Sequence, residues 1–156
     1  MNIKNLKKVL TSSTYIYEAD FRCADLRRAV FRGASLISSN LSGADLCGAD
    51  MRGADLSCTE FAEADMRQVD LRGADLSGVD MTCADLSEAD LRRVNFSSTT
   101  LCAAHLRGAN LRCTDLRLAD LARANLSGAD LRWADLRGVD LSEVNLDGAK
   151  LRGTKF

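Results

Sequence analysis

The sequence contains no apolar run near the ~18 residues that a membrane-spanning helix needs. Its opening, MNIKNLKKVLTSS, has neither the apolar stretch nor the small-residue cleavage site of a secretory signal. It also contains no CxxC pair, because its six cysteines are widely spaced, at Cys23, Cys47, Cys58, Cys83, Cys102 and Cys113. Free thiols in a reducing compartment fit this spacing better than a zinc site or a disulfide framework. We therefore expect a cytoplasmic protein without a membrane segment.

The chain has no excess of charge, since 21 basic and 22 acidic side chains give a formal net charge of -1. No overall field therefore favours nucleic acid or an anionic membrane, and any electrostatic specialisation must be local. The chain has a single histidine, His105, and no activated nucleophile accompanies it. Because catalysis needs convergent groups, we expect no enzymatic activity, no metal site and no cofactor.

What the sequence does contain is a five-residue repeat, visible in VDLRGADLSGVDMTCADLSEADL at residues 69–91. From Ile16 to Phe156, every fifth residue is Leu, Phe, Met or Ile, at 29 consecutive positions that we call centres. The residue two before each centre is small, Ala in 18 units and Thr, Val or Ser in 11. The residue between them is Asp in 16 units and Asn in 5.

A period of five excludes a helix, because a step of ~500° would scatter the centres around its whole circumference. In an extended segment, however, the small residue and the centre point to one side and the residue between them to the other. All 11 glycines stand two residues after a centre, where the chain must turn. The pattern therefore predicts short strands and corners that wind into a parallel β-solenoid.

The units ADLRG, ADLSG and ANLSG resemble the pentapeptide repeat family, whose motif is A(D/N)LXX, and the resemblance covers residues 14–156. It implies an all-β fold, a right-handed quadrilateral parallel β-helix with four units per coil and about seven coils. Residues 1–13 are then an N-terminal cap or tail. Some members of this family mimic duplex DNA, bind a type II topoisomerase and protect it from fluoroquinolones.

With four units per coil, residues 20 apart lie above one another, and two opposite sides receive opposite charge. The basic face carries seven arginines that each follow a centre, together with Trp133 at a turn: Arg32, Arg52, Arg72, Arg92, Arg112, Arg132 and Arg152. Counting Arg93, Lys150 and four aspartates, its net charge is +5. The acidic face has a net charge of -5, and its acidic residues are Asp20, Glu60, Glu63, Asp80, Asp120, Asp140 and Glu143.

These columns favour a non-enzymatic scaffold that presents flat charged faces to a protein partner, although they are also consistent with a purely solvating surface. The alternative is the topoisomerase (gyrase) mimic that the resemblance implies, against which the near-zero net charge and the arginine column argue. Nucleic acid is disfavoured because aspartates interleave with the arginines. The final stretch, LRGTKF, ends on a centre, and we expect a second copy to cover the C-terminal coil in an end-to-end homodimer.

Overall fold

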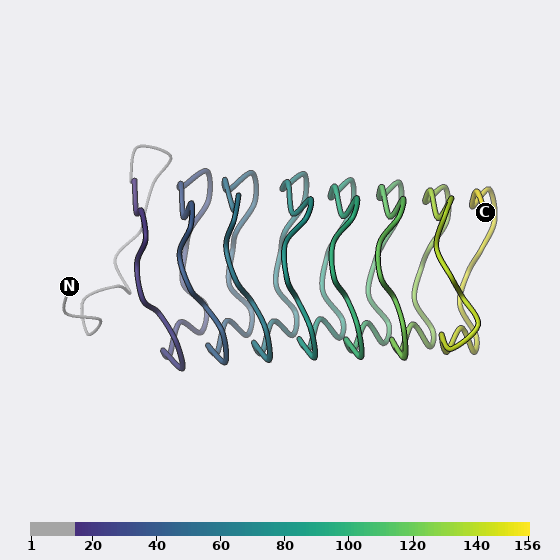
Figure 1. The fold of residues 1–156 in the computed structure, drawn as a ribbon, viewed down its shortest axis with the longest axis horizontal. Coiled ribbons are helices and arrows are strands. Elements are labelled where there is room, and N and C mark those ends of the chain that lie inside the picture. Colours follow the sequence, from purple (N-terminus) through teal and green to yellow (C-terminus); the bar gives the residue numbers. More distant parts are fainter. Residues whose placement is uncertain (1–14) are drawn as a thin grey trace.

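The computed structural model describes residues 15–156, and the predicted N-terminal cap or tail at residues 1–13 lies outside this range. Over the described range the chain winds in successive coils along one long axis (Figure 1). Each coil takes 20 residues, because Tyr15 pairs with Ser35 and Ser35 pairs with Asp55 as parallel bridges. The fold is the right-handed quadrilateral parallel β-helix that the resemblance implies.

The strands are single-residue bridges, which recur at every fifth position from Tyr15 to Lys155 with the exception of Asp140. Neither a helix nor a longer strand occurs in residues 15–156. Between coils, the main-chain N–H of a centre donates to the residue 19 positions ahead, as Leu41 does to Glu60 at 2.8 Å. Next to it, the N–H of the preceding residue donates backwards, as Asn40 does to Ala19 at 2.9 Å. These bonds form the hydrogen-bond ladder of each face.

Corners form because the residue two after a centre adopts a left-handed conformation. Its φ lies between 50° and 79° both for the glycines and for 16 other residues, among them Cys23 and Trp133. The following N–H then donates back to the centre, as Ala24 does to Phe21 at 3.0 Å. Glycine reaches this conformation without steric cost, which explains why every glycine of the chain stands at a corner.

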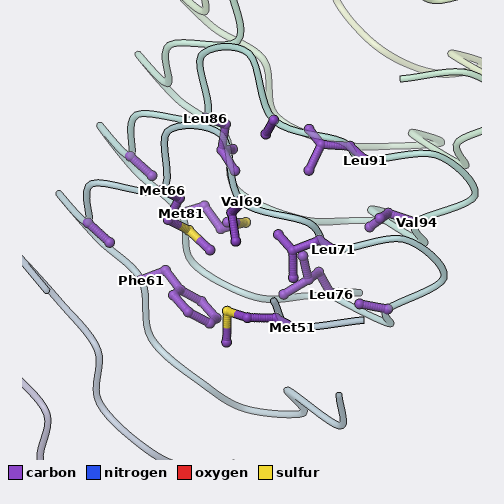
Figure 2. Close-up of a cluster of buried hydrophobic side chains, with 14 of the residues drawn as sticks. Met51, Phe61, Met66, Val69, Leu71, Leu76, Met81, Leu86, Leu91 and Val94 are labelled. Atoms are coloured by element: carbon purple, nitrogen blue, oxygen red, sulfur yellow. The ribbon is translucent and has the colours of Figure 1, made fainter. Parts of the chain in front are cut away.

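The core is a column of centres flanked by small residues, and both kinds of side chain point into the coil (Figure 2). Phe61, Leu71 and Met81 are completely buried. Burial of each such side chain contributes ~1.5 to 3 kcal/mol, so the coils are stabilised from Ile16 to Leu136, where the buried core ends. Where threonine replaces the small alanine its hydroxyl finds a partner, since Thr59 Oγ1 donates to the carbonyl of Leu36 at 3.0 Å.

Candidate functional site

The five-residue unit brings aspartate and arginine together on the surface wherever they flank a centre. In the pair Asp70 and Arg72, for example, the Oδ1 atom of the aspartate accepts hydrogen bonds from the main-chain N–H of the arginine at 3.2 Å and from the arginine Nε at 2.8 Å. The second carboxylate oxygen accepts from Arg72 Nη2 at 2.7 Å. We call this bidentate arrangement the Asp–Arg fork. The same fork joins pairs 20/22, 25/27, 50/52, 65/67, 90/92, 115/117, 130/132 and 135/137.

On the basic face, these forks are linked from one coil to the next. Arg52 Nε lies 3.4 Å from Asp70 Oδ2, and Arg72 Nε lies 3.6 Å from Asp90 Oδ2. The pKa of the Asp90 carboxyl is below its ordinary value, chiefly because the Arg92 side chain donates a hydrogen bond to it. The predicted arginine column is therefore a chain of alternating charges over this stretch, which runs Asp50, Arg52, Asp70, Arg72, Asp90, Arg92.

Three units of the basic face lack the aspartate of the fork. Val30, Asn110 and Lys150 occupy its position, and the arginines that follow them, Arg32, Arg112 and Arg152, form no ion pair within residues 15–156. Arg112 uses only its main-chain N–H, which donates to Asn110 Oδ1 at 3.4 Å. The net positive charge of the face is therefore concentrated at these interruptions.

A shallow groove of about 480 Å³ lies beside the middle interruption. Its walls are side chains of two neighbouring columns, namely Arg72, Gly73, Arg92, Arg93, Arg112 and Cys113. Arg72 and Arg92 are held by their own aspartates, whereas Arg93 and Arg112 are exposed and make no side-chain ion pair among the described residues. The groove thus presents two guanidinium groups without a side-chain ion pair in residues 15–156, although the charge of Arg112 contributes to lowering the pKa of Asp130 on the next coil.

The acidic face differs because few of its carboxylates have a basic partner. Asp20 forms a fork with Arg22, which lowers its pKa to about 2, and Arg123 Nε lies 3.2 Å from Glu143. Three aspartates there accept turn N–H bonds at 2.9 to 3.0 Å and form no ion pair among the described residues, and the first of them also accepts from the Thr82 hydroxyl: Asp80, Asp120 and Asp140. Glu60 accepts from the Asn40 side-chain amide, and Glu63 is exposed. The structure places all seven predicted acidic residues on one side of the coil.

The hydrogen-bond ladder has gaps where two carboxylates are stacked on neighbouring coils and neither forms an ion pair with an arginine. Within residues 15–156, three stacked pairs lack an arginine ion pair, at 55/75, 60/80 and 120/140. These are also the three at which the backward N–H bond of the second residue, from Asp75, Asp80 and Asp140, is absent. Stacks with an arginine ion pair, such as 50/70 and 65/85, keep it. Like charges ~5 Å apart repel, which explains the local separation of the coils.

Of the three gaps in residues 15–156, the one at Asp120 and Asp140 is where the parallel bridge between the stacked residues is lost as well. The bonds expected from Leu121 N–H to Asp140 and from Arg123 N–H to Ser142 are also absent from the described ladder. Glu143 is the one corner residue between residues 18 and 153 without a positive φ. A cleft of about 440 Å³ opens here, lined by Leu118, Ala119, Asp120, Leu121, Ala122, Gly138, Asp140, Ser142 and Glu143.

Trp133 and Leu118, the two large apolar residues at corners, each cover a glycine one coil further on. A Cβ built on Gly153 would lie 2.3 Å from Trp133 Cε3, and one on Gly138 would lie 2.6 Å from Leu118 Cδ2. Both side chains remain more than half exposed, at 55% and 68%. Trp133, a predicted site residue, therefore packs on the basic face while more than half of its surface stays exposed.

The remaining candidate groups do not converge. His105 is exposed in its column between Asp85 and Asn125, and all six cysteines are free thiols. Cys83 and Cys102 lie on adjacent coils, where the Cys83 N–H donates to the Cys102 carbonyl at 2.9 Å. No group of three His, Cys, Asp or Glu side chains suited to a metal lies in the part of the chain that the structure describes. That part also has no helix with the length and apolar character to cross a membrane.

Sequence reasoning grouped the arginines of the basic face but did not single out Arg93, Asn110 or Cys113 as part of a groove. The signal was present, because Asn110 is the only amide among the aspartate positions of that column. Its meaning depends on the fork, which joins residues two apart through specific side-chain conformations. Leu118 likewise gave no sign that it would cover Gly138.

A parallel β-helix with charged flat faces defines a class of repeat proteins, and comparison with known proteins supports this assignment. The family described as pentapeptide repeats matches overlapping stretches of the chain at residues 14–53, 34–73, 59–97, 70–108, 101–138 and 119–156. The chain therefore belongs to the pentapeptide repeat family. None of the curated proteins matches it.

Among solved structures, the chain is similar to a pentapeptide repeat protein from the Arabidopsis thaliana thylakoid lumen, with 26% identity and a TM-score of 0.54. That match covers 76% of this chain and 69% of the other. QnrB1, a plasmid-mediated fluoroquinolone resistance protein, matches in a trypsin-treated form with 20% identity and a TM-score of 0.56, over 90% of this chain and 78% of its own. At this level of identity, the likeness to QnrB1 shows the fold alone.

Proposed function

We propose that this protein is a non-enzymatic interaction scaffold whose opposite charged faces bind protein partners. One observation carries the proposal: the 20-residue register stacks the arginine column on one side of the coil and, on the opposite side, acidic residues of which Glu60, Glu63, Asp80, Asp120 and Asp140 form no ion pair among the described residues. A near-neutral chain thereby acquires two surfaces of opposite charge. Such surfaces steer and orient a charged partner, and their effect falls with ionic strength.

The side chains of the basic face are suited to binding because many are already held in place. The fork fixes both the aspartate and the arginine of a unit, and Arg52 and Arg72 keep only 32% and 38% of their side-chain surface exposed. A partner that binds such side chains loses less conformational entropy than one that must order free arginines.

The proposal is tested by affinity capture from native lysate, followed by reconstitution with the purified partner. Three triple variants are compared with the wild type. The acidic-face variant combines Asp80→Asn, Asp120→Asn and Asp140→Asn, and the basic-face variant combines Arg72→Gln, Arg92→Gln and Arg112→Gln. The control, on a third face, combines Ser57→Lys, Ser77→Lys and Ser97→Lys. The control changes net charge as much as the first variant. Direct binding that is lost with one face and kept with the control supports the scaffold, whereas equal binding by all four proteins contradicts it.

The second candidate is a DNA mimic that binds a type II topoisomerase (gyrase) and protects it from fluoroquinolones. The observation that favours it is the row of acidic-face carboxylates without basic partners, of which Asp80 and Asp120 are exposed examples. The test is a gyrase supercoiling assay in the presence of a fluoroquinolone. Restored supercoiling by the wild type but not by the acidic-face variant would establish mimicry, and no restoration would exclude it.

The C-terminal coil supports the proposal of an end-to-end homodimer. Leu151 and Phe156 are centres of this coil, yet 37% and 62% of their surfaces are exposed. A second copy packed against this end would bury both side chains and continue the stack of centres. Sedimentation of the wild type and of Phe156→Asp tests this: a dimer lost in the variant supports it, and a monomer at high concentration contradicts it. We also propose that the protein acts in the cytoplasm, in line with its free thiols.

A further inference from the structure

Asn110 ends the chain of linked ion pairs on the basic face. In the two coils before Arg92, the arginine contacts the aspartate of its own unit and that of the next coil, as Arg52 contacts Asp50 and Asp70 and Arg72 contacts Asp70 and Asp90. Arg92 has its own Asp90 but meets Asn110 on the next coil, and Arg112 has Asn110 in place of its fork partner. One amide thus removes the carboxylate that two arginines would share.

The groove beside Asn110 is where the missing carboxylate leaves positive charge. Arg93 and Arg112 line it without an ion pair in the described residues, and Arg72 and Arg92 supply two further guanidinium groups. The small residues Gly73 and Cys113 complete the lining of the groove, and their size leaves room for a bound polypeptide segment. Four arginines therefore line a space in which two carboxylates, Asp70 and Asp90, form ion pairs with them, and Asp130 on the next coil interacts with Arg112 without an ion pair within contact distance.

We infer that this groove binds an extended acidic segment of a protein partner, whose carboxylates pair with Arg112 and Arg93 in place of the aspartate that Asn110 replaces. The inference rests on the proposed scaffold function and names the chemistry of its partner. A carboxylate is the ligand that the neighbouring arginines already bind in bidentate geometry, with Nε and Nη2 both 2.6 to 2.8 Å from carboxylate oxygens in Arg92 and Arg132. Arginine and carboxylate groups match in this planar geometry.

A protein segment fits the groove better than a nucleic acid strand. Asp90 and Asp130 flank Asn110 in its column, one coil away on either side, and would repel a continuous phosphate backbone. A polypeptide can instead place single carboxylates between them. In an extended chain, alternate residues lie ~6.8 Å apart on one side, so two acidic side chains can reach arginines on successive coils.

The test measures binding of a fluorescein-labelled peptide with five Asp-Ser repeats to the full chain, with the corresponding Asn-Ser peptide as a probe control. The decisive variant is Asn110→Asp, which supplies the missing carboxylate within the protein and should weaken binding about tenfold, the effect of one charged contact. Arg112→Gln should weaken it by a similar factor. The matched control is Asn125→Asp, which makes the same substitution at the same repeat position on another face.

Binding of the Asp-Ser peptide that is lost in Asn110→Asp and kept in Asn125→Asp supports the inference. Equal weakening in both variants would show general charge attraction and overturn it, as would unchanged binding by Asn110→Asp. A duplex DNA oligonucleotide that binds where the Asp-Ser peptide does not would also overturn it. If the peptide fails while a purified partner still binds through another face, only this inference falls and the scaffold proposal stands.

Discussion

Trp133 covers Gly153 so closely that a Cβ on Gly153 would lie 2.3 Å from the indole ring. Gly153 also has a φ of 76°, so two separate constraints select glycine there. By contrast, Gly128 has a φ of 68°, but a Cβ added to it would meet no atom within 4 Å apart from its own chain neighbours. The contact between Trp133 and Gly153 joins two successive coils of the basic face near its C-terminal end.

Gly153→Ala should therefore destabilise the protein more than Gly128→Ala. The control substitution costs only the left-handed strain of ~1 kcal/mol, whereas Gly153→Ala also forces the indole to move, which adds ~1 to 3 kcal/mol. Urea unfolding of both single variants and of Trp133→Ala with Gly153→Ala measures the difference. Equal free energies of unfolding for the two glycine variants would show that the indole moves at no cost.

Asp70→Asn should destabilise the protein modestly, because Asp70 contacts both Arg52 and Arg72. Asparagine keeps the turn hydrogen bond, so the loss is confined to the two ion pairs, and their partial exposure limits it to ~0.5 to 1 kcal/mol. The matched control is Asp55→Asn, at a stack without arginine, which should be neutral or stabilising because it removes repulsion. Chemical denaturation at low and high salt checks both, and a larger loss in Asp55→Asn would contradict the explanation.

Stability should fall when the solution is acidified below about pH 4. The fork holds the pKa of several carboxyls below the ordinary value of 3.8, and that of Asp135 is about 2 because of its hydrogen bond from Arg137. In the unfolded chain these groups take up protons near pH 4, whereas in the folded protein they stay ionised to lower pH. Their contribution is complete above the unfolded pKa and is lost as pH falls toward 2. Circular dichroism melts from pH 7 to pH 2 measure it, and a melting temperature that stays constant down to pH 2 would refute it.

The main-chain amides beside the Asp120 and Asp140 gap should exchange hydrogen faster than their counterparts in the preceding coil. Leu121 lacks the ladder bond that Leu101 makes to Asp120 at 2.7 Å. Ala122→Arg places an arginine two residues after Asp120, as in the units with a fork, and should slow exchange at Leu121 and Asp140 by closing the gap. Hydrogen exchange, followed by mass spectrometry or NMR, is measured in Ala122→Arg and in the control Ala103→Arg, whose residue stands at a corner where the hydrogen-bond ladder is intact. Equal exchange at Leu101 and Leu121 in the wild type would show that the gap is not open in solution.

The solenoid, with its inward and outward sides and its corners, could be predicted from the periodicity of the sequence, whereas the four-sided coil, and with it the composition of each face, was implied by the resemblance to pentapeptide repeat proteins. The centres recur without a slip, so a four-sided coil assigns every fifth residue to a known column, and the stacks of Asp50 on Asp70 and of Asp70 on Asp90 follow directly. The predicted residues of the basic and acidic faces lie on those faces. Whether either face binds a partner remains a prediction.

The details of the candidate site could not be predicted in the same way. The fork depends on the side-chain conformations of Asp70 and Arg72, and the groove depends on which arginines stay unpaired once the forks have formed. The open ladder at Asp120 and Asp140 depends on a balance between main-chain hydrogen bonds and repulsion across the coils. A repeat pattern gives the position of each group but not the outcome of that competition.

By itself, the sequence determined the period, the inward and outward sides of every unit and the corners, and the four-sided register that the resemblance implies then assigned the charged residues to faces. The physical reason is that burial of a centre every five residues is a local requirement that each unit meets in the same way. Only the tertiary structure decided which charges neutralise one another, where Asn110 leaves Arg112 unpaired, and where Leu118 and Trp133 press on the next coil. These features arise between coils, where residues 20 apart in sequence meet and where spacing, side-chain conformation and repulsion are settled together.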